Sequence, residues 1–230
     1  MATKYINNVK YMRKYKILLI FISMTGTLLS GASATSPTPY RPLRYTHVTG
    51  QIDWYTCGAA AVSTLLTYYY GDEVSEQEVL EVAFAATQES GKDPLEGLTA
   101  LSLKRAMQQR DYQVKAYRVN LEQLVDYFQR GGLPVVAHVT KPQLHFLVIS
   151  GIVPDPRTQR PQVLLADPSW GRRIIPLEEL VTYKGFSGVI LIAVPKSQEQ
   201  LEEVRRLQQE ELTWAQQELS RLASLRERMP

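Results

Sequence analysis

The 230-residue sequence is poor in cysteine and contains no tract of low complexity. Its single cysteine, Cys57, has no second thiol in the chain, so no intramolecular disulfide can form. The 13 glycines and 13 prolines are too few for a collagen-like chain, and 44% apolar against 21% charged residues excludes a mostly disordered one. These absences leave a globular protein of one domain with additional segments.

Acidic residues are missing from the first 34 positions, which hold five of the 26 basic residues. The remaining chain has 21 basic and 23 acidic residues, a net charge of −2, so the overall charge of +3 comes from the N-terminus alone. A globular part without a positive excess gives no support to nucleic-acid binding, and we expect no nucleic-acid partner.

Residues 1–34 have the layout of a secretory signal peptide. A basic stretch precedes the apolar run Ile17–Leu29, and the small residues that follow end in Ala32-Ser33-Ala34, an A-x-A cleavage pattern. The run is short for a bilayer span, so a retained anchor is the less favoured alternative. We therefore expect an exported protein that touches the membrane only through this signal, with a mature chain that begins near Thr35.

Composition divides the rest of the chain into three parts. Residues 35–47 hold three prolines and predict an extended linker, and residues 48–195 predict one folded domain. Residues 196–230 predict a long charged helix, whose apolar stripe of Leu212, Ala215, Leu219 and Leu222 packs on its own domain or docks a partner.

Within the folded domain, helical patterns come first and strand patterns follow. Helices are expected at 57–70, 75–87, 99–109 and 121–129, and strands at 133–139, 145–153, 163–166 and 188–194. This order predicts an α+β fold in which N-terminal helices pack on an antiparallel sheet.

Cys57 has both the residue type and the position that nucleophilic catalysis needs. Helix 57–70 places it in the first turn, where the helix dipole and free backbone N–H groups stabilise negative charge, and a thiol attacks only as the thiolate. The alternative is an inert, buried cysteine, which can occupy any position in a helix. The first-turn position and the odd cysteine count of an exported chain favour a reactive thiol.

A thiol nucleophile needs a base, and the chain has three histidines. His47 lies in the predicted linker and would be loosely held. His138 lies inside the apolar strand VVAHV, where a structural role is favoured. His145 begins the strand HFLVISG beside a loop, which predicts a side chain that faces a cleft from a rigid backbone. His145 is the preferred base.

Two further polar residues can complete the site. Asp167 follows strand 163–166, and if this strand forms an antiparallel hairpin with 145–153, the carboxylate lies near His145 and can orient the imidazole. Alone, the Asp-Pro-Ser stretch is typical of a turn. Gln51 lies six positions before Cys57, where its amide and the Cys57 N–H can stabilise an oxyanion.

In this order along the chain, the residues resemble those of the bacteriocin-processing, double-glycine branch of the papain-like cysteine peptidases. The likeness covers roughly residues 48–195 and is carried by Gln51 with Tyr55–Ala60, by Leu133–Val136, by His145–Val148 and by Ala166–Pro168. The resemblance implies a papain-like fold, with Cys57 as nucleophile, His145 as general base and then acid, Asp167 as the orienting residue and Gln51 as an oxyanion donor. It also implies peptide-bond hydrolysis through a thioester, often after a Gly-Gly pair, with no metal and no organic cofactor.

The sequence departs from the best-known members, which are cytosolic domains fused to membrane transporters. It has an export signal and neither transmembrane spans nor a nucleotide-binding P-loop. In layout it resembles the stand-alone periplasmic proteases of functional-amyloid (Fap) secretion systems, which implies an exported fibre subunit or secretion component as the substrate.

Two other functions remain open for the same residues. One is a non-catalytic peptide-binding module of a secretion system on the same fold, and the other is acyl transfer by the same triad. Three stretches outside the candidate site predict only turns or core positions, namely Gly131-Gly132, Trp170-Gly171 and Lys184-Gly185-Phe186.

Overall fold

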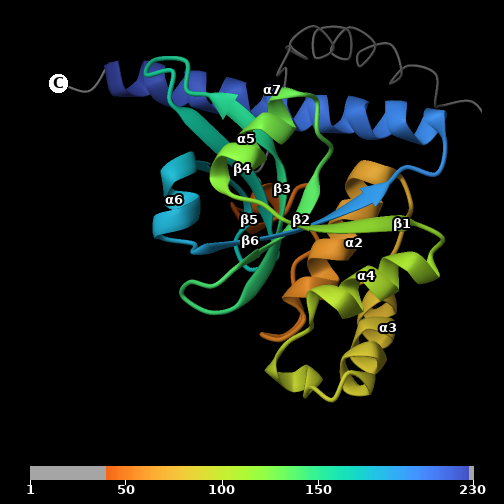
Figure 1. Ribbon diagram of the computed structural model, residues 1–230. Helices are drawn as coiled ribbons and strands as arrows, with labels where there is room; N and C mark the ends of the chain where they lie inside the picture. The colour runs from red at the N-terminus through yellow and green to blue at the C-terminus, as the bar shows by residue number, and fades with distance from the viewer. Residues whose placement is uncertain (1–39, 228–230) are drawn as a thin grey trace, which may run out of the picture. The chain divides into compact units, whose positions relative to one another are not determined.

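One antiparallel sheet forms the centre of the computed structural model, which describes residues 40–227. Its strands in this part of the chain are β1 (Gln113–Arg118), β2 (Val135–Val139), β3 (His145–Pro154), β4 (Pro161–Asp167), β5 (Gly171–Pro176) and β6 (Phe186–Val194). They lie side by side in the order β1-β6-β2-β3-β4-β5 (Figure 1). The predicted signal peptide lies outside the described residues.

Four of the helices correspond to the four that were predicted for the domain. The described helices are α1 (Tyr40–Arg44), α2 (Cys57–Tyr70), α3 (Glu76–Glu89), α4 (Ala100–Gln109), α5 (Leu121–Gln129), α6 (Leu177–Thr182) and α7 (Gln198–Glu227), with a short 3-10 helix at Pro94–Glu96. The predicted α+β fold, with N-terminal helices packed on an antiparallel sheet and a long C-terminal helix, is therefore confirmed.

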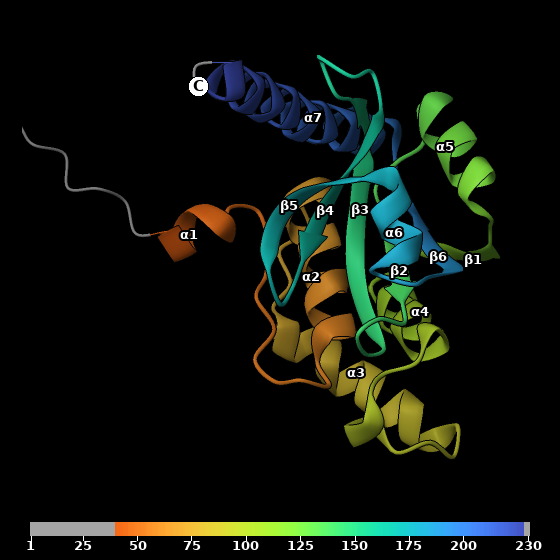
Figure 2. The same cartoon turned by 90° about the vertical axis from the view of Figure 1, so that its left-hand side faces the viewer.

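Helices cover both faces of the sheet. On one face, Leu65 of α2 and Leu103 of α4 belong to the same core as Val148 of β3. On the opposite face, Leu124 of α5 and Leu180 of α6 share a core with neighbouring strand residues, and Figure 2 shows these two helices on the side of the sheet away from α2. Strands β3 and β4 are thus buried on both faces, which gives the residues at their ends a rigid backbone.

Helix α7 packs on the domain along a stripe that includes polar residues. Its fully or mostly buried positions are Val204, Gln208, Glu211, Ala215 and Leu219, spaced by three or four residues. The Gln208 side chain donates hydrogen bonds to the carbonyl oxygens of Ser150 at 2.8 Å and Gly132 at 2.9 Å. Of the two predicted alternatives, the structure therefore shows packing on the chain's own domain, whereas Leu222 at the end of the predicted stripe is exposed.

The prediction of an extended linker at residues 35–47 is wrong for residues 40–47, the part that the structure describes. Residues 40–44 form α1, and the Arg44 guanidinium and the Tyr45 hydroxyl donate hydrogen bonds to the carbonyl oxygens of Trp170 and Ser169. His47, expected to be loosely held, contacts Glu211 of α7 at 2.5 Å. The proline content of the segment could not predict these contacts, because the residues contacted lie more than 120 positions away in the sequence.

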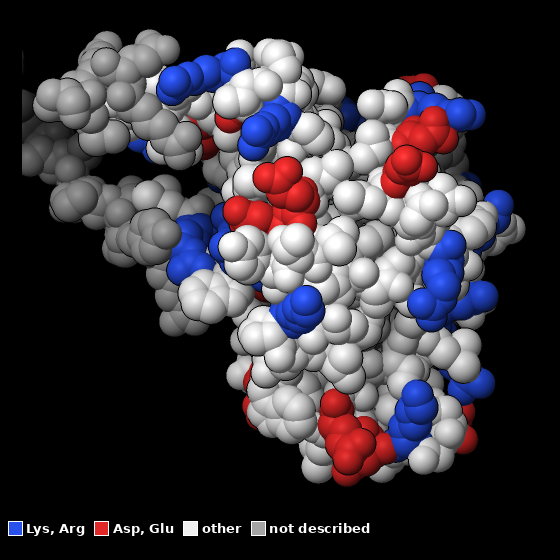
Figure 3. Space-filling model, turned by 60° about the vertical axis from the view of Figure 1, so that its left-hand side comes forward, with Lys and Arg blue, Asp and Glu red and all other residues white. Residues whose placement is uncertain are grey.

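Basic and acidic side chains are interspersed on the face of the molecule that Figure 3 shows, without one extended patch of a single sign. This distribution fits the small net charge of the chain beyond its N-terminus. Among the helices of residues 40–227, none has the length and apolar character needed to cross a bilayer.

Candidate active site

Cys57 is the first residue of α2, as predicted, and is buried. The preceding Thr56 makes no side-chain cap to this helix, and its hydroxyl instead accepts the Asp53 N–H at 3.1 Å and donates to the Asp53 carbonyl oxygen at 2.9 Å. The first N–H groups of a helix have no partners within the helix, and they lie where they stabilise an anion. Cys57 therefore lies at the end of α2 where backbone N–H groups are available to an anion.

The hairpin predicted between the second and third strand patterns is present as β3 and β4. Val148 lies opposite Ala166, so the start of β3 and the end of β4 meet at the same end of the sheet. There the His145 Nε2 and the Asp167 Oδ1 are 2.8 Å apart, with 8% of the histidine side chain and none of the aspartate side chain exposed. A carboxylate bonded to Nε2 leaves Nδ1 of the same ring available to Cys57, which is among the groups that raise the pKa of His145.

These contacts shift the pKa values of both groups toward their charged forms. Burial disfavours the imidazolium, but the hydrogen bonds to Asp167 and Cys57 and their negative charges outweigh it and raise the pKa of His145 from 6.5 to about 9. Burial likewise opposes ionisation of Asp167, yet His145 and the Lys184 ammonium lower the pKa of that carboxyl to about 2. At neutral pH the pair is therefore an imidazolium and a carboxylate.

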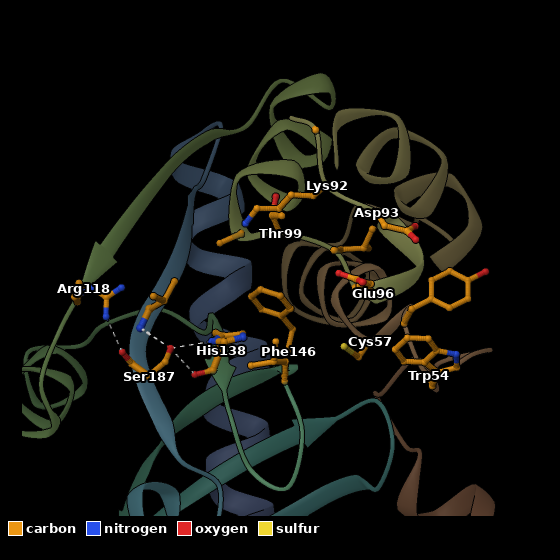
Figure 4. A pocket seen from close by; sticks show the side chains of 17 residues that line it. Trp54, Cys57, Lys92, Asp93, Glu96, Thr99, Arg118, His138, Phe146 and Ser187 are labelled. Carbon is orange, nitrogen blue, oxygen red and sulfur yellow. Dashed lines mark hydrogen bonds between the residues drawn. The ribbon is translucent and has the colours of Figure 1, made fainter. Parts of the chain in front are cut away.

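A cleft of about 700 Å³ opens beside Cys57. Figure 4 shows Cys57 between Trp54 and Phe146 at one end, with Arg118 and Ser187 at the other. One wall comes from the sheet, and the other comes from the segment between α3 and α4, where Lys92, Asp93 and Glu96 lie (Figure 4). The thiol is thus placed where an extended polypeptide can reach it.

Among the described side chains, the hydrogen bonds of Gln51 go to residues other than Cys57. Its amide Nε2 donates to the carbonyl oxygen of Asp53 at 2.9 Å, and its Oε1 accepts from the Ser169 hydroxyl at 2.7 Å. One amide hydrogen of Nε2 remains for another acceptor. The Gln51 side chain is therefore fixed in the loop before α2, and an oxyanion role requires that the remaining hydrogen reach the substrate.

His138 occupies the wall of the same cleft and does not bond Asp167. The Ser187 hydroxyl donates to the His138 carbonyl oxygen, so the Ser187 oxygen accepts from Nδ1–H of the His138 ring at 3.0 Å. Burial and the neighbouring charge of His145 lower the pKa of His138, which keeps this ring neutral at pH 7. His138 is held by a neighbouring hydroxyl, in keeping with its expected structural role.

Two residues beside Asp167 were missed from the sequence. The Lys184 ammonium donates to Asp167 Oδ2 at 2.8 Å, and the Ser169 N–H donates to Oδ1 at 3.0 Å. The Lys184-Gly185 pair was interpreted as a turn, and no spacing rule relates position 184 to 167. Within residues 40–227, no three His, Cys, Asp or Glu side chains gather in the way a metal ion requires.

Comparison with known proteins identifies the family of this chain. The model of the peptidase C39 family matches residues 45–198. A protein of Pseudomonas aeruginosa named "Probable functional amyloid protease FapD" is 27% identical over 159 residues, which cover 67% of this chain and 63% of that relative, so the match spans less than two thirds of the relative's length.

Two solved structures share the fold. One is a double glycine motif protease from an AMS/PCAT transporter in complex with the leader peptide, with a TM-score of 0.51, 26% identity, and coverage of 65% of this chain and 91% of that one. The other is the peptidase domain of Streptococcus ComA, with a TM-score of 0.52, 21% identity, and coverage of 65% and 98%. The resemblance inferred from the sequence is confirmed.

Proposed function

The chain belongs to the peptidase C39 family, the cysteine peptidases of the double-glycine type, and on this premise we propose that it is an exported endopeptidase that cleaves after a Gly-Gly pair in a secreted or fibre-forming protein. The observation that carries the proposal is the hydrogen bond between Asp167 and His145, a histidine whose pKa Cys57 also raises, together with the place of Cys57 in the wall of a cleft. Cys57 is the nucleophile, His145 the acid and base, and Asp167 the residue that orients the imidazole.

In the acylation step, the Cys57 thiolate attacks the carbonyl carbon of the scissile bond, and the carbonyl electrons move to oxygen. The Cys57 N–H and the remaining Gln51 amide hydrogen donate to this oxyanion. When the tetrahedral species collapses, the C–N bond breaks and the leaving amine takes a proton from the His145 imidazolium. The product is a thioester at Cys57.

In the deacylation step, neutral His145 takes a proton from a water molecule as the water oxygen attacks the thioester carbonyl. The C–S bond breaks, the carboxylic acid product leaves, and the thiolate and imidazolium are restored. Asp167 keeps Nε2 of His145 protonated throughout, so Nδ1 carries the exchanged proton.

Relatives support the substrate class. The P. aeruginosa relative is named a functional amyloid protease, which favours a fibre-forming substrate, and the transporter protease is a double glycine motif protease with a bound leader peptide. The large side chains of Trp54 and Phe146 on either side of Cys57 fit a preference for glycine next to the scissile bond (Figure 4).

Cleavage of quenched fluorescent peptides tests the proposal. One peptide contains Gly-Gly and its matched control contains Val-Val at the same positions. We expect the purified protein to cut after the second glycine, located by mass spectrometry, and to cut the Val-Val peptide at least about tenfold more slowly.

The Cys57→Ala variant is the control for the nucleophile. It should keep its fold by circular dichroism and lose cleavage, because no other thiol exists in the chain. Equal cleavage by this variant would exclude Cys57 as the nucleophile, and equal rates on the two peptides would exclude the glycine preference.

A further inference from the structure

Lys184 is a mostly buried cation directly beside the proposed catalytic residues. It lies in the turn between α6 and β6, and its side chain is only 12% exposed. Its carbonyl oxygen accepts the backbone N–H groups of Thr140 at 3.1 Å and Lys141 at 2.9 Å, and its own N–H donates to the Glu179 carbonyl oxygen at 3.0 Å. The backbone of Lys184 is thus fixed between the end of β2 and helix α6.

The position of Lys184 follows from the alternation of side chains along β4. Leu165 faces the core under α5 and α6, and Asp167, two residues later, points to the same side of the sheet. The turn after α6 borders that side, so it can present a lysine to the carboxylate. Cys57 instead comes from α2 on the opposite face, and it lines the cleft together with Phe146 at the start of β3.

The two oxygens of Asp167 have separate partners. Oδ1 accepts from His145 Nε2 at 2.8 Å and from the Ser169 N–H at 3.0 Å, whereas Oδ2 accepts from Lys184 at 2.8 Å. The Asp167 side chain has no exposed surface, so without Lys184 one oxygen of a buried carboxylate would lack a partner. Lys184 therefore fixes the rotation of the carboxylate that aligns Oδ1 with His145.

Lys184 also balances the net charge of the proposed site. In the thiolate form of the site, Cys57 and Asp167 are negative and His145 is positive, which leaves one negative charge uncompensated in a buried place. The Lys184 ammonium makes the four charges sum to zero. Without Lys184, the His145 imidazolium would be the one positive charge in this group to stabilise both the Cys57 thiolate and the Asp167 carboxylate.

We propose that Lys184 is a positioning residue of the active site, which orients Asp167 and supplies the second positive charge that lets thiolate and carboxylate exist together. The proposal rests on the proposed function of Cys57 and His145. The titratable groups that face this cluster are Cys57 from α2, His138 from β2, His145 from β3 and Asp167 from β4.

Alkylation of the single cysteine by iodoacetamide across pH tests the proposal without a substrate. The variants are Lys184→Met, which removes charge and donor, Lys184→Gln, which removes the charge alone, and Lys184→Arg, which keeps the charge. Lys141→Met is the matched control, because Lys141 is an exposed lysine near the same turn and its ammonium donates only to the Thr182 carbonyl oxygen at 3.3 Å.

We expect the midpoint of alkylation to move up by about one pH unit in Lys184→Met and Lys184→Gln, a tenfold loss of thiolate below the midpoint. Lys184→Arg and Lys141→Met should stay close to the wild type. Once a cleaved peptide is identified, the acidic and basic limbs of the pH profile of kcat/KM should both move to higher pH in Lys184→Gln. Loss of the ammonium disfavours the thiolate and favours the imidazolium, so both groups release their protons at higher pH. A purely structural role would lower the rate without moving either limb.

The outcomes separate the two proposals. If the wild-type thiol reacts like an ordinary cysteine, with a midpoint near about 8.5, the proposed function fails. If the wild-type thiol is activated and Lys184→Gln has the same midpoint, the role of Lys184 is refuted and the proposed function stands. If Lys184→Met does not fold, Lys184→Gln and Lys184→Arg decide, because each retains a donor to Oδ2.

Discussion

Loss of the Glu211 charge should destabilise the domain much more than loss of the neighbouring Glu210 charge. Glu211 lies on the buried stripe of α7, and both of its oxygens accept from Arg172 at 3.1 Å. The side chains of Arg172 and Glu211 are 12% and 6% exposed, and the Arg172 guanidinium stacks on Trp214 at 3.5 Å from the ring centroid. Glu211→Gln thus leaves a mostly buried guanidinium without its counter-charge.

The magnitude follows from what remains at Arg172. Removing one partner of a buried pair costs about 3–5 kcal/mol, and stacking on Trp214 with some solvent contact places this case at about 2–3 kcal/mol. With a urea m-value of about 2 kcal/mol/M, the unfolding midpoint should fall by about 1–1.5 M. Glu210 is 57% exposed and pairs with Arg206 one helical turn away, so Glu210→Gln should cost less than about 0.5 kcal/mol.

Urea unfolding followed by circular dichroism at pH 7 measures both variants against the wild type. A shift in midpoint at constant m-value reports stability alone. If both glutamine variants unfold at the same urea concentration, the Arg172–Glu211 pair does not contribute as its burial indicates, and the reasoning is refuted.

Three further predictions concern the site. The kcat/KM profile should fall as pH rises through about 9, because the raised pKa of His145 keeps the imidazolium and its ion pair intact below that value; a fall near 6.5, the ordinary pKa of histidine, would show that Asp167 does not hold the ring. Gly58→Ala should lower the free energy of unfolding by about 1–3 kcal/mol, since an added Cβ would lie 2.9 Å from Leu103; thermal melts that match the wild type would contradict this contact. Glu76→Ala should cost about 1–2 kcal/mol and lower kcat/KM, because both Glu76 oxygens accept the Ile52 N–H and tie down the loop before α2; unchanged melts and kinetics would count against it.

Elements with strong local signals were predictable from the sequence. The Ser75 and Glu78 capping box marks the start of α3, and both of its hydrogen bonds are present. The buried strand pattern of β3 and its turn toward β4 predict that His145 and Asp167 lie together, and the β3–β4 pairing is present. Local pattern was sufficient where pairing partners are adjacent in the chain.

The strands that were missed, β1 and β5, are the two edges of the sheet. In β1 only Val114 is buried, so the alternation that identifies a strand is absent. Lys184 was missed for a different reason, because its contact with Asp167 depends on how α6 packs against the sheet. The contact between His47 and Glu211 likewise joins distant parts of the chain, and local residue patterns do not predict such contacts.

The central claim is that His145 activates Cys57, and labelling of the only thiol tests it most directly. Iodoacetamide labelling rates at pH 6 should be high in the wild type, fall at least about tenfold in His145→Ala, and change little in His138→Ala, whose ring lies in the same cleft but is held by Ser187. Equal labelling rates in the wild type and His145→Ala would contradict the claim and leave the chain with the fold of a C39 peptidase but without its activated thiol.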